Sequence, residues 1–164
     1  MGKVIEIPEE CLNAFAPLSN QTKSNFTDSS PSTKYIIYRM TDDFLSSALV
    51  HVSNTTSTLA TADASYNDML SRLPLDHCRW IVYSLDPSEH STLQQKNIPS
   101  TLCFMAWSPE TAPIKQRMVY SASKGFFTRG LPGGADMFLF QATSRDEIEL
   151  PVIVERIVEK YTRD

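Results

Sequence analysis

The stretch Leu102–Lys124 reads LCFMAWSPETAPIKQRMVYSASK, and it decides how the rest of the chain is interpreted. Its apolar start, which ends at Trp107, predicts a buried strand, and the SPETAP segment at 108–113 predicts a turn. A helix then follows, and its first turns carry Lys115, Arg117 and Met118. Because a helix that starts beside a buried strand holds its first turns in a fixed position, this segment suits a surface that docks on another protein.

Further apolar runs before and after this stretch predict the remaining elements. Strands are expected at 35–40, 49–52, 78–85, 102–107 and 137–142, where aromatic and β-branched residues gather. Helices are expected at 8–15, 65–73, about 112–128 and from Pro151 onward. Helices on both faces of a five-stranded mixed sheet would bury all of these runs. The predicted fold class is therefore α/β of the α+β type.

The length of 164 residues fits a single domain, 1–164, with a real hydrophobic core. Residues 19–33 are polar and rich in Ser and Thr, which predicts a loop or disordered insert. Residues 53–64 are weakly patterned, and 86–100 read as a polar connection. We find no internal repeat.

Composition and charge argue against several classes of protein. The net charge of −4 is unfavourable for wrapping nucleic acid. No run approaches the ~18–20 apolar residues of a membrane span, and no secretory signal precedes the first helix, so a cytoplasmic protein is expected. The three cysteines are widely spaced and form no zinc or disulfide pattern, which is typical of buried thiols in a reducing compartment; they are Cys11, Cys78 and Cys103.

No motif predicts catalysis, a cofactor or a metal. None of the three histidines lies in a nucleophile or metal motif; they are His51, His77 and His90. Gly133-Gly134 lacks the residues of a phosphate loop, and Asp42-Asp43 is more typical of a turn than of a carboxylate pair. A small cytosolic enzyme is thus a remote alternative, which a closed pocket with titratable groups of perturbed pKa would favour.

The helix after Trp107 presents two different sides. At about 100° per residue, Val119 and Phe126 lie within about 20–40° of Lys115, and this side is expected to face the core. An arc at roughly 180–300° mixes cations, a hydroxyl and apolar groups; it consists of Arg117, Lys124, Ser121, Ile114 and Met118. Such a mixed arc is typical of a protein-binding face. The plainer alternative is a solvated helix face with Met118 half-buried at its edge.

These segments resemble the actin-depolymerising factor/cofilin family. In that family a strand that contains a tryptophan is followed by the motif SPxTAP, then by K/R-x-K/R-M, a tyrosine and SSK. The matching residues of this chain are Ser108 to Pro113, Lys115, Arg117, Met118, Tyr120, Ser123 and Lys124. The family's CRYAxYD strand resembles residues 78–83, FQATD resembles 140–144, and the opening helix resembles 10–15. The resemblance implies a single ADF-homology domain over 1–164.

The resemblance implies a monomer that binds actin and promotes filament turnover by depolymerisation, with at most weak severing, in the cytoplasm and at the cytoskeleton. The implied contact residues for an actin monomer are Gly2, Lys3, Val4, Ile5, Lys115, Arg117, Met118 and Ser121. Lys115 and Arg117 would pair with actin carboxylates, while Met118 would fill an apolar cleft. The family's regulatory serine would fall near Lys3, where this chain has no hydroxyl, so a phosphate switch is not expected.

The family's second surface, which contacts a neighbouring protomer in a filament, is less basic here. Its implied residues are Lys96, Glu155, Arg156 and Lys160, and Glu159 stands where a basic residue is expected. Binding to monomers is therefore predicted to be firmer than binding to filaments. Alternatives are a monomer-sequestering or filament-side-binding relative without severing activity. Phosphoinositides are a second candidate ligand, through Lys115, Arg117 and Lys124.

Overall fold

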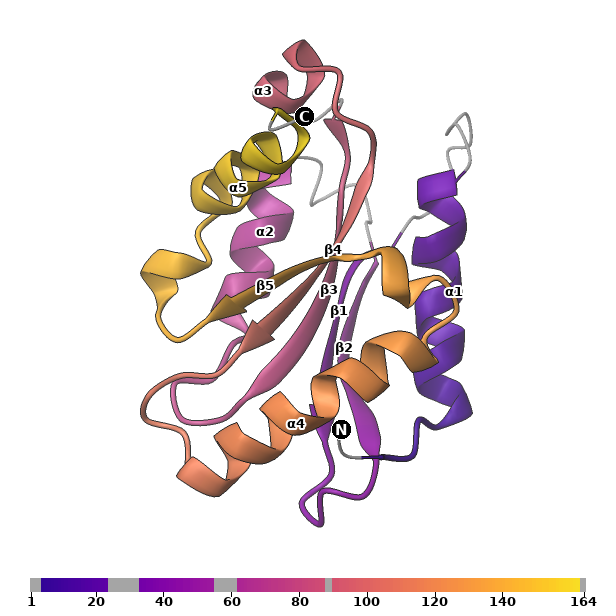
Figure 1. The fold of residues 1–164 in the computed structure, drawn as a ribbon, viewed down its shortest axis with the longest axis vertical. Coiled ribbons are helices and arrows are strands. Elements are labelled where there is room, and N and C mark those ends of the chain that lie inside the picture. The colour runs from indigo at the N-terminus through magenta and orange to yellow at the C-terminus, as the bar shows by residue number, and fades with distance from the viewer. Residues whose placement is uncertain (1–3, 24–32, 55–61, 88–89, 163–164) are drawn as a thin grey trace.

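The computed structural model describes residues 4–23, 33–54, 62–87 and 90–162 (Figure 1). In chain order the longer elements are α1 (Glu9–Lys23), β1 (Thr33–Met40), β2 (Ser47–Asn54), α2 (Ala62–Ser71), β3 (Arg79–Leu85), α3 (Ser91–Gln95), β4 (Thr101–Trp107), α4 (Ile114–Gly130), β5 (Phe138–Ala142) and α5 (Leu150–Thr162). Two short 3₁₀ turns, η2 (Gly134–Asp136) and η3 (Arg145–Glu147), flank β5.

The five strands form one sheet in the order β2-β1-β3-β4-β5. Strands β1, β2, β3 and β4 pair antiparallel, whereas β5 pairs parallel with β4. The sheet is therefore mixed, and the predicted α+β architecture with five strands is confirmed.

Helices cover both faces of this sheet, as Figure 1 shows. Alternate residues of the central strands point to opposite faces, so Tyr38 and Trp80 pack with α1 and α4, while Ile37 and Ile81 pack with α2 and α5. Because the central strands are buried on both faces, their sequences read as continuous apolar runs.

Trp80 forms the centre of the core on the α4 side. Its ring is fully buried and stacks on Phe127 with a centroid distance of 4.6 Å. Tyr120 lies 5.1 Å from the same ring, and Phe104 lies 6.3 Å away. Since Tyr120 and Phe127 belong to α4, this aromatic cluster anchors that helix to β3 and β4.

Two segments expected to lack structure contain helices. Residues 19–23 of the predicted polar insert continue α1, beyond Leu18, which is buried; residues 24–32 lie outside the described part of the chain. The 86–100 connection contains α3, because Leu93 is buried against the core. Each of these helices contains one apolar residue that is buried, Leu18 in α1 and Leu93 in α3, which the polar composition of the segments does not reveal.

Helix α4 ends at Gly130, close to the predicted end near residue 128, and Gly134 then packs directly under its last turn. A Cβ atom on Gly134 would lie 2.1 Å from the carbonyl oxygen of Thr128. We therefore expect Gly134→Ala to lower the free energy of unfolding by about 1–3 kcal/mol in urea denaturation. Gly125→Ala is the matched control in α4, because its Cβ would meet only the flexible end of Arg129.

Gly125→Ala is expected to leave stability unchanged or to raise it by up to about 1 kcal/mol, since alanine favours a helix interior. An unchanged urea midpoint for Gly134→Ala would contradict the close approach of Gly134 to the end of α4.

Candidate functional site

The position of α4 is fixed at its start by hydrogen bonds from other segments. The indole N–H of Trp107, at the end of β4, donates to the carbonyl oxygen of Pro74 at 2.7 Å. The backbone N–H of Ser108 donates to the carbonyl oxygen of Ala142 at 2.9 Å. The turn that leads into α4 is thus tied to the segment after α2 and to the end of β5.

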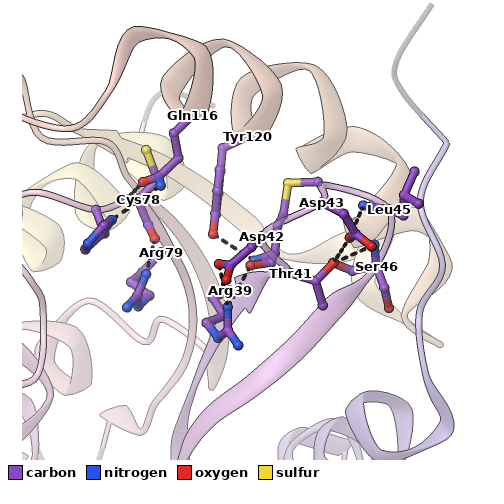
Figure 2. Close-up of polar contacts among 12 residues, drawn as sticks. Arg39, Thr41, Asp42, Asp43, Leu45, Ser46, Cys78, Arg79, Gln116 and Tyr120 are labelled. Atoms are coloured by element: carbon purple, nitrogen blue, oxygen red, sulfur yellow. Dashed lines mark hydrogen bonds and ion pairs between the residues drawn. The ribbon is translucent and has the colours of Figure 1, made fainter.

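Two side chains of α4 bind the end of the sheet (Figure 2). The Oε1 atom of Gln116 accepts a hydrogen bond from the backbone N–H of Cys78 at 2.5 Å. The hydroxyl oxygen of Tyr120 accepts one from the backbone N–H of Met40 at 2.7 Å. Because both donors are backbone groups at strand ends, the first two turns of α4 are held at a fixed distance from β1 and β3.

The predicted core side of α4 is confirmed in part. Val119 and Phe126 are partly buried and pack against the core, but the fully buried residues of the helix are Tyr120, Ser123 and Phe127. The centre of the buried side is therefore rotated by roughly 60–100° around the helix from the predicted one.

The arc predicted to bind a partner is open to solvent. Ile114 is 72% exposed and Met118 is 67% exposed, so Met118 is not half-buried against the domain. Lys115 and Ser121 are also exposed, whereas Arg117 is half-buried. Cationic, hydroxyl and apolar groups therefore lie next to one another on the first turns of a rigidly held helix.

The two predicted contact cations lack acidic partners. Among the residues that the structure describes, no carboxylate lies within ion-pair distance of Lys115 or Arg117. The Nζ atom of Lys115 lies 5.8 Å from the ring centroid of Phe44, and the buried Nε atom of Arg117 has no hydrogen-bond partner within the described part of the chain. Both charges remain available to a partner's carboxylates.

The predicted contact tail is only partly described. Gly2 and Lys3 lie outside the described residues. Val4 is 71% exposed, but Ile5 is buried in the core, so its side chain is not part of a contact surface. The tail then pairs with the β1–β2 turn, because the carbonyl oxygen of Glu6 accepts a hydrogen bond from the backbone N–H of Ser47 at 2.9 Å.

Two large apolar side chains are exposed on the first turns of α4 itself. Eight large hydrophobic residues are exposed in the described part of the chain, and they include Ile114 and Met118 of α4 and Leu75 of the segment after α2. Leu75 is tied to the turn before α4 by the Thr111 hydroxyl, which donates to its carbonyl oxygen. Clustered exposed apolar groups of this kind mark interaction surfaces.

The predicted filament-side residues lie elsewhere, on α5 and at the end of α3; they are Lys96, Glu155, Arg156 and Lys160. All four are exposed. The Arg156 guanidinium lies 5.4 Å from the Phe140 ring centroid, and the Lys160 ammonium lies 4.6 Å from that of Phe138. Each of these two cations therefore lies over an aromatic ring of β5. Helix α3, which ends next to Lys96, packs beside α5.

Of the three cations predicted to bind phosphoinositides, Lys115 lies apart from the other two. The ammonium group of Lys124 donates to Oε1 of Gln141, on β5, at 2.9 Å, and Arg117 and Lys124 line the same small pocket beside α4. Lys115 lies instead toward Phe44 in the β1–β2 turn. The structure therefore places Lys115 and Lys124 on different sides of α4.

Sequence reasoning missed several residues of this surface. Phe44 and Leu45 were assigned no role, although two apolar residues in the polar TDDFLSS segment were a usable signal. The role of Gln116 in bonding Cys78 carried no signal in the sequence. Arg79 was read only as a strand residue; it is half-buried, and burial lowers the pKa of its guanidinium.

Other kinds of site find little support among the described residues. No cluster of three His, Cys, Asp or Glu side chains there is placed to hold a metal ion. Burial raises the pKa of all three cysteine thiols, Cys11, Cys78 and Cys103, which disfavours the nucleophilic thiolate form. In the same part of the chain, no helix has the length and apolar character needed to cross a membrane.

Solved structures share this fold over nearly the whole chain. Actin depolymerization factor 2 from Plasmodium berghei superposes with a TM-score of 0.71 at 20% identity, covering 97% of this chain and 99% of that one. Cofilin from Streptomyces griseoflavus gives a TM-score of 0.68 at 22% identity, covering 94% and 97% of the two chains. At these identities the likeness establishes the fold.

Sequence comparison establishes the family. Cofilin from Mycosarcoma maydis is 28% identical over 157 residues, covering 96% of each chain. Cofilin from Schizosaccharomyces pombe is 29% identical over 157 residues, covering 95% of this chain and 96% of the other. The family model for cofilin/tropomyosin-type actin-binding proteins matches residues 4–158. The chain therefore belongs to the ADF/cofilin family of actin-binding proteins.

Proposed function

We propose that this protein binds monomeric actin through the start of α4 and promotes the turnover of actin filaments. The observation that carries the proposal is the exposed mixed surface on the first turns of α4, in a chain of an actin-binding family. The protein acts in this proposal by binding and not by catalysis. Its place of action is the cytoplasm, at the actin cytoskeleton.

The chemistry of the surface fits an acidic partner with an apolar cleft. Met118 and Ile114 offer apolar area without losing contacts inside the domain, since both are largely exposed. Lys115 and Arg117 offer positive charge that no acidic side chain of the described part of the chain neutralises. Actin is acidic, so these charges would favour association and orient the complex.

Binding to filaments is proposed to be weaker than binding to monomers. The α5 surface contains Arg156 and Lys160, but both cations rest over the rings of Phe140 and Phe138. Glu155 and Glu159 are exposed on the same helix and offset their charge. A weakly cationic second surface gives little added affinity for a neighbouring protomer in a filament.

Titration of fluorescently labelled monomeric actin, in its ADP and ATP states, tests this proposal. We expect saturable binding to monomers and weaker co-sedimentation with filaments. Lys96→Glu, at the end of α3, is expected to leave monomer binding unchanged and to reduce co-sedimentation further. Co-sedimentation with filaments as tight as monomer binding would contradict the proposed preference, and absence of binding to either form would contradict the proposed function.

Phosphoinositide binding stays a prediction. The positions of Lys115 and Lys124 on different sides of α4 do not favour a single headgroup site formed by both residues.

A further inference from the structure

The turn between β1 and β2 is a fixed structure with two apolar residues at its tip. The backbone N–H of Thr41 donates to the carbonyl oxygen of Ser46 at 2.8 Å and closes the turn. Within it, one carboxylate oxygen of Asp43 accepts hydrogen bonds from the Thr41 hydroxyl at 2.6 Å and from the Leu45 backbone N–H at 3.1 Å (Figure 2). The tip that carries Phe44 and Leu45 is therefore held by its own polar network.

Phe44 adopts a backbone conformation that is rare for a large side chain. Its φ angle is 60°, in the left-handed region that usually contains Gly, Asn or Asp. The ring packs partly against the core on the α4 side. As a result the next residue, Leu45, projects away from the domain and is 62% exposed. A strained backbone conformation, such as the positive φ of Phe44, is often found at functional contacts.

The tip lies between the N-terminal tail and α4. The backbone N–H of Glu6 donates to the carbonyl oxygen of Leu45 at 2.8 Å, which holds the tail against the turn. On the other side, the ring of Phe44 lies 5.8 Å from the Nζ atom of Lys115, on the first turn of α4. The turn that carries Leu45 is thus linked to the tail through Glu6 and to α4 through Phe44 and Lys115.

We propose that the β1–β2 tip is a further docking element for the same actin protomer. Leu45 contacts an apolar strip on actin beside the carboxylate that pairs with Lys115, and Phe44 is a positioning residue for the Lys115 ammonium group. The occupant is actin because the Phe44 ring of the tip lies 5.8 Å from Nζ of Lys115, a residue of the proposed actin-binding surface. This inference rests on the proposed function of that surface.

Leu45→Ser tests the direct contact. Because burial of a leucine side chain on binding is lost, we expect the dissociation constant for labelled monomeric actin to rise about tenfold. Leu139→Ser is the matched control, since Leu139 is 60% exposed but lies on β5, away from the tip. It is expected to bind as the unmodified protein does. Thermal unfolding of both variants checks that each is folded.

The outcomes separate this inference from the proposed function when Lys115→Glu is measured in parallel. If Lys115→Glu weakens binding and Leu45→Ser does not, the docking role of the tip is overturned while the function of α4 stands. If neither change weakens binding, both proposals fail. Equal weakening by Leu45→Ser and Leu139→Ser would also overturn the docking role of the tip.

A double-mutant cycle tests the positioning role of Phe44. Phe44→Asn removes the ring, and asparagine tolerates the left-handed backbone conformation of this position. We expect the variant to bind monomeric actin about two- to fivefold more weakly, because the cation–π contact between Lys115 and the ring is lost. When Lys115 is already replaced by Ala, Phe44→Asn is expected to have little further effect. Strictly additive effects of the two changes would overturn the positioning role.

Discussion

Lys115→Glu is expected to weaken the binding of monomeric actin by about 30-fold or more, because removing a desolvated interface charge costs about 2–5 kcal/mol. Reversal adds repulsion against the carboxylate that Lys115 is proposed to meet. The fold should not change, since Lys115 is exposed and forms no ion pair with any described residue. The measurement is titration of labelled monomeric actin at low and moderate salt.

Lys96→Glu provides the matched control for charge. It changes the net charge by the same amount, but Lys96 lies at the end of α3, which packs next to α5 and not next to α4. We expect its monomer binding to be unchanged. Equal weakening by both variants would assign the effect to overall charge, and unchanged binding of Lys115→Glu would remove α4 from the contact surface.

Trp80→Ala is expected to lower the free energy of unfolding by about 3–5 kcal/mol, because truncation of a fully buried tryptophan leaves a large cavity. The ring contacts Phe127, Tyr120 and Phe104, so two of the lost contacts are with α4. That loss is a large share of the total stability of a typical domain, about 5–15 kcal/mol. Urea denaturation followed by circular dichroism measures it.

Trp80→Phe separates ring packing from hydrogen bonding. The buried indole Nε1 of Trp80 has no hydrogen-bond partner among the described residues, so phenylalanine should retain most of the stability. Trp107→Phe, in contrast, removes a 2.7 Å hydrogen bond to the carbonyl oxygen of Pro74. Equal destabilisation by Trp80→Phe and Trp80→Ala would show that the indole N–H group, and not the ring area, stabilises this part of the core.

The sequence predicted the strands well, because residues such as Ile36 and Val82 belong to continuous apolar runs that only a doubly covered sheet buries. It was only partly right on the orientation of α4. Val119 and Phe126 pack against the core as spacing predicted, but Tyr120 is buried more deeply, because its hydroxyl accepts a hydrogen bond from the backbone N–H of Met40. Such a partner, 80 positions away in the chain, cannot be inferred from local spacing.

The candidate surface was predicted in the same partial way. Lys115 and Met118 are exposed, as the resemblance to the family implied for contact residues, although spacing alone placed Lys115 near the predicted core side. Ile5 is buried, against the contact role assigned to the tail, and Leu45 is exposed at a position to which no role was assigned. Both depend on the pairing of Glu6 with residues 45–47, a long-range contact between two segments with no periodic pattern.

The hydrogen bonds of Gln116 and Tyr120 with the ends of β3 and β1 have a consequence for association kinetics. A helix already immobilised in the free protein loses little backbone entropy when it meets its target, so encounter should be followed directly by complex formation, without a slow refolding phase. Differences in affinity among surface variants should then arise chiefly from how long each complex survives, through the dissociation rate.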